Sequence, residues 1–101
     1  MKIKQGVTLG GLTKEMMLAW LVADSVWDEQ MEEGVVTSGL DGKHKLLSKH
    51  YTGNALDLRT RYFAPEQIET CARRLREILG RDYDVVVETT HIHVEYDPKG
   101  A

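Results

Sequence analysis

Three of the four histidines of this chain lie close to acidic residues in two short stretches, SKHYTGNALD at residues 48–57 and ETTHIHVEYDP at residues 88–98. The first stretch contains His50 and Asp57, and the second contains His91 and His93. Two neutral imidazoles and one carboxylate are a common zinc-binding set that leaves a fourth position for water, the open geometry of a hydrolase. The residue types therefore predict one Zn²⁺ ion held by His50, Asp57 and either His91 or His93.

Glu88 is the acidic residue best placed to act as a general base. A two-residue turn at Thr89-Thr90 would pair Glu88 with His91 on the same face of a hairpin. Because β-branched residues resist the positive φ of such turns, a wider turn is expected, and Glu88 still stays near the histidines. Zinc lowers the pKa of a bound water to about 7, and Glu88 would take its proton and return it to the leaving amine.

Two helices are expected to support these residues. Apolar residues at three- and four-residue spacing predict an amphipathic helix from the N-cap Thr13 to about Glu33. Its apolar stripe contains Leu18, Leu21, Val22 and Val26. A second helix is expected to begin at Pro65 and to end at Gly80. Its stripe contains Ile68, Cys71, Ala72, Leu75, Ile78 and Leu79. The tryptophans and methionines are assigned to helix packing.

Strands are expected at residues 35–37, 55–58, 83–88 and 92–96, whereas residues 1–12 are expected to be an irregular entry and His50 to lie on a loop. Strand alternation places His91, His93 and Glu95 on one face of the sheet and the intervening apolar residues on the other, toward the helices. The prediction is an α+β fold in which two helices cover one face of a small, mostly antiparallel sheet.

Length and charge limit the remaining possibilities. A chain of 101 residues can enclose one apolar core, so we expect a single domain, residues 1–101, with its core in residues 13–97. The net charge of −3 provides no basic surface for nucleic acid or an anionic membrane, and neither is expected as a partner. No signal peptide is apparent, so we expect the protein to be cytoplasmic as synthesised. We also expect it to be a monomer.

The first stretch resembles the S-x-H-x-x-G-x-A-x-D signature of the zinc D-alanyl-D-alanine carboxypeptidase and L-alanyl-D-glutamate endopeptidase family, which includes many phage endolysins. The five matching residues are Ser48, His50, Gly53, Ala55 and Asp57. The H-x-H strand downstream extends the resemblance over residues 35–97. The order and spacing of these motifs are also similar to those in the zinc-binding domain of hedgehog proteins. The resemblance implies that His50, Asp57 and His93 bind zinc and that His91 stabilises charge on the tetrahedral intermediate. A rival alignment pairs Glu88 with His91 and makes His91 the ligand.

The resemblance implies hydrolysis of peptide bonds in bacterial peptidoglycan, by a phage or prophage enzyme that acts on the cell wall after release. Carboxypeptidase members carry an arginine shortly after the Ser-Gly step, but here Ser38-Gly39 is followed by Leu40-Asp41. This difference favours an endopeptidase, whose substrate continues past the cut. Basic residues that could substitute for the arginine are Lys43, Lys49, Arg59 and Arg61. The alternative is a zinc-stabilised, non-catalytic binding domain of hedgehog type.

Overall fold

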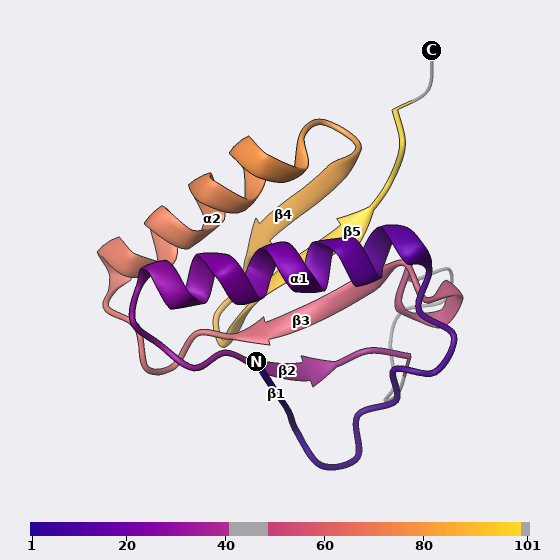
Figure 1. Cartoon of the computed structure of the whole chain (residues 1–101), viewed down its shortest axis with the longest axis horizontal. Coiled ribbons are helices and arrows are strands. Elements are labelled where there is room, and N and C mark those ends of the chain that lie inside the picture. The colour runs from indigo at the N-terminus through magenta and orange to yellow at the C-terminus, as the bar shows by residue number, and fades with distance from the viewer. Residues whose placement is uncertain (41–48, 100–101) are drawn as a thin grey trace.

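Short apolar segments build a five-stranded sheet in the computed structural model, which describes residues 1–40 and 49–99 (Figure 1). The strands are β1 (Lys2–Ile3), β2 (Val35–Ser38), β3 (Ala55–Arg59), β4 (Tyr83–Val87) and β5 (His91–Tyr96). Their order is β1-β2-β3-β5-β4, with β1 parallel to β2 and every other neighbouring pair antiparallel. The sheet is therefore mixed. The two-residue strand β1 lies in residues 1–12, which are otherwise irregular as expected.

Helices α1 (Lys14–Glu29) and α2 (Pro65–Leu79) lie over one face of the sheet, as predicted (Figure 1). The Thr13 hydroxyl caps α1 by accepting a hydrogen bond from the Met16 amide at 3.2 Å. The helix ends earlier than predicted, because Gln30 is its C-cap and Met31 adopts a left-handed φ of 57°. None of residues 30–33 is buried. Neither helix in the described part of the chain is long and apolar enough to cross a bilayer.

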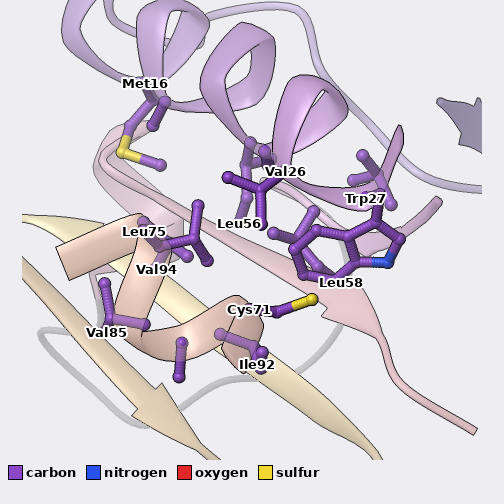
Figure 2. Packing of buried hydrophobic residues seen from close by; sticks show 14 of the residues in the cluster. Met16, Val26, Trp27, Leu56, Leu58, Cys71, Leu75, Val85, Ile92 and Val94 are labelled. Atoms are coloured by element: carbon purple, nitrogen blue, oxygen red, sulfur yellow. The ribbon is translucent and has the colours of Figure 1, made fainter. Parts of the chain in front are cut away.

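The hydrophobic core lies between the two helices and the sheet (Figure 2). Alternate residues of the two central strands point toward the helices. In β3 these are Leu56 and Leu58, each 1% exposed, and Ile92 in β5 is fully buried. Trp27 of α1 and Leu75 of α2 close the core from the other side. Because side chains alternate along a strand, the residues between these apolar positions lie on the other face of the sheet. Neither α1 nor α2 covers that face, and we call it the uncovered face.

Helix α1 buries only part of the predicted stripe: Val26 is buried and Val22 packs against the core, as predicted, but Leu18 and Leu21 do not. Its buried residues are Met16, Ala19, Ala23, Val26 and Trp27. Leu18 and Leu21, which belong to the predicted stripe, are 53% and 70% exposed and face away from the core. The helix therefore has two apolar sides, and the spacing of Leu18 and Leu21 did not reveal which side faces the sheet.

The chain enters β3 through a tight turn that packs against the start of α1. A short 3₁₀ helix, η1 (Lys49–Thr52), carries His50 where a loop was expected. Gly53 follows with φ +75°, and a Cβ atom at this position would overlap the Gly11 carbonyl oxygen. The Gly53 carbonyl accepts a hydrogen bond from the Thr13 amide at 3.1 Å. The close approach at Gly53 is therefore to the backbone before α1.

We expect Gly53→Ala to lower the free energy of unfolding by about 2 kcal/mol or more, because it combines a left-handed φ with a backbone overlap. Gly6→Ala is the matched control, since Gly6 has φ +90° but nothing within 4 Å of an added Cβ. The control should lose about 1 kcal/mol. Urea denaturation measures both losses. Equal losses in the two variants would show that the contact with Gly11 is not tight.

Candidate metal centre

The uncovered face of the sheet carries the polar residues of both sequence stretches. In the register of β3 and β5, Asp57 pairs directly with His93, Arg59 with His91, and Ala55 with Glu95. Paired residues of antiparallel strands share a face. The prediction that His91, His93 and Glu95 lie on one side of the sheet is therefore confirmed, and Asp57 lies on that side with them.

Three side chains from η1, β3 and β5 meet on this face. The Nε2 atom of His50 lies 3.2 Å from Oδ1 of Asp57, and Nδ1 of His93 lies 2.9 Å from the same oxygen. One potential ligand atom from each of the three residues falls within 4.8 Å of the others, so the group could hold a metal ion. His91 is more distant, with its Nε2 atom 3.5 Å from Asp57 Oδ1.

The buried His50 ring is oriented by a backbone carbonyl. Its Nδ1 atom lies 2.8 Å from the Gly39 carbonyl oxygen, which can only accept, so Nδ1 carries the hydrogen and Nε2 faces Asp57. A side chain at Gly39 would overlap the Thr8 carbonyl oxygen, so glycine is needed to place this carbonyl. We did not predict this role of Gly39 from the sequence, where its only signal is a glycine directly after a strand.

Glu95 orients the His93 ring in the same manner. The Nε2 atom of His93 lies 2.8 Å from Oε1 of Glu95, while Nδ1 faces Asp57. A carboxylate that accepts a hydrogen bond from the second ring nitrogen is a frequent partner of metal-binding histidines, because it sets the tautomer and the ring orientation. Nδ1 is therefore the nitrogen of His93 that is available to a metal ion.

Each of the His50 and His93 rings lies between two oxygen atoms that accept hydrogen bonds, and a neutral ring cannot satisfy both. A neutral imidazole has one N–H group, and His50 uses it on Gly39 while His93 uses it on Glu95. The remaining lone pairs of both rings then face the Asp57 carboxylate, which can only accept. Either a further proton on each ring or one divalent cation between them resolves the conflict. A single M²⁺ ion carries the same charge as the two protons that it would replace.

The electrostatic balance of the cluster agrees with this account. Burial acts to raise the pKa of the Asp57 carboxyl, but hydrogen bonds with His50 and His93 outweigh it and hold the pKa well below its usual range. The hydrogen bond with Asp57 raises the pKa of His93 against the opposing effect of burial, and Glu95 raises it further. The cluster thus favours an ionised carboxylate with positive charge beside it.

The donor spacing fits a tetrahedral ion. Metal–ligand bonds of about 2.0–2.2 Å at tetrahedral angles hold two donor atoms about 3.3 Å apart. The distances from Asp57 Oδ1 to His50 Nε2 and to His93 Nδ1 are 3.2 and 2.9 Å. All three donor atoms lie within 4.8 Å of one another.

The turn between β4 and β5 is shorter than expected. The Glu88 amide donates to the His91 carbonyl at 2.8 Å, so Thr89 and Thr90 form a two-residue turn and the expected wider turn is wrong. Neither threonine has a positive φ, and the Thr60 amide supports the turn with a hydrogen bond to the Thr90 carbonyl at 3.3 Å. The β-branched residues are therefore accommodated without the strain that was expected of them.

Glu88 shares the uncovered face with His91. The pairing of Val87 with Ile92 continues to Glu88 and His91, so their side chains lie on one side, with His93 on the diagonal about 7–8 Å away. The Glu88 side chain is exposed and makes no hydrogen bond or ion pair with other residues that the structure describes. The catalytic roles of Glu88 and His91 stay predictions.

Not all of the other residues that the sequence singles out are described by the structure. Lys43, His44 and Ser48 lie outside the described residues. Lys49 forms an ion pair with Asp97 at 3.7 Å. The Arg61 guanidinium lies over the Tyr62 ring at 4.9 Å, whereas Arg59 shares the face of the metal-holding group.

Comparison with family models, curated proteins and solved structures finds no match for this chain. The resemblance of residues 48–57 to a peptidase signature therefore stays a prediction.

We expect the purified protein to bind one divalent ion per chain. His50→Ala, Asp57→Ala and His93→Ala should each reduce the affinity by at least about 100-fold, because each removes a ligand. His91→Ala is the control and should retain the ion, since His91 lies outside the group of three. Competition with a chromophoric chelator measures these affinities. If His91→Ala loses the ion while His93→Ala keeps it, the assignment of His93 is wrong.

Proposed function

We propose that this protein is a zinc-dependent metallopeptidase that hydrolyses peptide bonds in bacterial peptidoglycan. The observation that carries the proposal is the meeting of His50, Asp57 and His93 on the uncovered face of the sheet. Two imidazoles and a carboxylate suit catalytic zinc, which keeps a fourth position for water or substrate. The resemblance of residues 48–57 to a peptidase signature provides the substrate class.

The exposure of the group supports access from one side. The His50 side chain is only 3% exposed and closes the inner side, whereas Asp57 and His93 are 13% and 18% exposed. His91, on the same strand as His93, reaches 27%. A substrate would therefore approach along the uncovered face of the sheet, from the side of β5.

Glu88 supplies the proton-transfer group in this proposal. Zinc, when bound, polarises the scissile carbonyl and lowers the pKa of a coordinated water to about 7. Glu88 accepts the proton from water and returns it to the leaving amine. Its exposed side chain lies beside His91 and has no competing ion pair in the described chain, so it is able to turn toward the site.

His91 supplies a hydrogen-bond donor for developing negative charge. The Thr90 hydroxyl lies 3.0 Å from Nδ1 of His91 and can donate to it, which leaves the N–H group on Nε2. That nitrogen lies 3.5 Å from Asp57 Oδ1, at the edge of the metal-holding group. A donor in this place stabilises the oxyanion that forms at the substrate carbonyl.

We favour an endopeptidase of a phage or prophage lysis system. Leu40 follows Gly39 at the point where similar carboxypeptidases carry an arginine that grips the terminal carboxylate of the substrate. Arg59 lies on the same face as the site, but it belongs to β3, where it pairs with His91, and not to β2, which contains Ser38. A substrate that continues past the cut needs no such grip.

Glu88→Gln should bind zinc like the wild type but lose about 100-fold or more in hydrolysis, because the amide cannot accept the proton. The assay follows the clearing of permeabilised bacterial walls by the zinc-loaded protein, with mass spectrometry of the released muropeptides. Glu69→Gln is the matched control, since Glu69 is an exposed residue of α2 on the opposite side of the sheet, and it should keep full activity.

Two outcomes would contradict the proposal. If the zinc-loaded wild type leaves walls and muropeptides intact, the protein is the zinc-stabilised binding domain and not a peptidase. If Glu88→Gln hydrolyses walls as fast as the wild type, the peptidase stands but Glu88 is not its base. The new free amine found in the muropeptides identifies the bond that is cut.

A further inference from the structure

Helix α1 presents an apolar stripe to solvent, opposite its core-facing residues. Met17, Leu18 and Leu21 are 54%, 53% and 70% exposed, and Leu21 lies three residues after Leu18 and four after Met17, which places them on one side of the helix. Helix α2 lies in the same layer (Figure 1), and its exposed residues are mostly charged. Its exposed residues include Glu66, Glu69, Arg73 and Glu77. Exposed apolar side chains gathered on one helix indicate a surface that binds another protein.

The stripe ends in opposite charges. Lys14 lies at its N-terminal end and Asp28 at its C-terminal end, both exposed, and Leu21 is seven residues from each. A second copy placed antiparallel across a twofold axis at Leu21 therefore brings each Lys14 opposite the partner's Asp28. With a rise of about 1.5 Å per residue, each ion pair lies about 10 Å from the axis. In this arrangement the charged ends of the two stripes attract each other and their apolar centres are in contact.

A shallow hollow beside the stripe fits the same arrangement. It has a volume of about 210 Å³ and is lined by Met1, Trp20, Leu21 and Asp24. In the antiparallel register, Leu18 of the partner subunit lies opposite Asp24, because both positions are three residues from Leu21. Each copy can therefore insert a leucine into the hollow of the other.

We propose that the protein forms a symmetric homodimer through α1, with the two helices antiparallel and Leu21 on the twofold axis. A single pair of helices is expected to bury less than a standard interface of about 800 Å² per partner, so we expect a reversible dimer and would look for it between about 1 μM and 1 mM protein. The metal-holding group lies on the opposite face of the sheet and stays uncovered. The dimer is independent of the proposed function, and it departs from the monomer expected from the sequence.

Sedimentation velocity over this concentration range tests the proposal. Leu21→Glu should raise the dimer dissociation constant by at least about tenfold, because two buried carboxylates would face each other on the axis. Met31→Glu is the control, since Met31 is 92% exposed but lies beyond the helix, and it should change nothing. A wild type that stays monomeric at 1 mM, or a Leu21→Glu variant that dimerises like the wild type, overturns the proposal.

Charge exchange tests the antiparallel register. Lys14→Glu and Asp28→Lys should each weaken dimerisation by about three- to tenfold at low salt, because each places like charges opposite one another. An equimolar mixture of the two variants should recover wild-type association, since their charges are complementary. A parallel pair would not be weakened by either single change, because like charges already face one another there. The antiparallel arrangement is overturned if neither single variant dimerises more weakly than the wild type, or if the mixture does not recover wild-type dimerisation. Circular dichroism checks that both variants are folded.

Discussion

The Asp57 carboxylate is the group on which the geometry of the site depends. Its Oδ1 atom lies within 3.5 Å of one nitrogen from each of three imidazoles, those of His50, His91 and His93. Removing a carboxylate from water without compensating charge is strongly unfavourable. Positive charge, from protons or from a divalent ion, therefore has to lie among these nitrogens. This requirement explains why η1 and β5, distant in the sequence, both bring imidazoles to β3.

The pleat of β3 lets an 11.5 kDa chain carry this charge without disturbing its core. Leu56 and Leu58 point into the helix layer, while Asp57 between them points to the uncovered face. The neighbouring strand repeats the arrangement, with Ile92 inward and His93 outward. The apolar and charged clusters are thus separated by the sheet itself. Among the residues that the structure describes, His50 reaches the cluster from outside the sheet, and its Nδ1 atom is hydrogen-bonded to a backbone carbonyl.

Period-two alternation in β5 was enough to predict which of its residues share a face, because a strand has only two sides. Helical periodicity was less informative for α1, since a helix with two apolar stripes gives no sign of which one meets the sheet. Leu18 and Leu21 were assigned to the wrong side for this reason. Likewise β1 is only two residues long and has no pattern of its own, because its pairing with β2 defines it. The role of the Gly39 carbonyl was not predicted either, because every residue has a backbone carbonyl and the sequence does not show which one accepts a hydrogen bond from a histidine.

A divalent ion in this group would contribute to stability as well as to chemistry. Binding only the folded state at a free concentration 100 times its dissociation constant adds about 2.7 kcal/mol, a substantial part of the about 5–15 kcal/mol typical of a domain. Loss of activity on metal removal therefore does not separate catalysis from unfolding. Glu88 and His91 lie outside the group of three, so changes there leave the ligands and their stabilising effect in place. Substitutions of these neighbouring residues can therefore distinguish a metal ion that takes part in a reaction from one that only stabilises the fold.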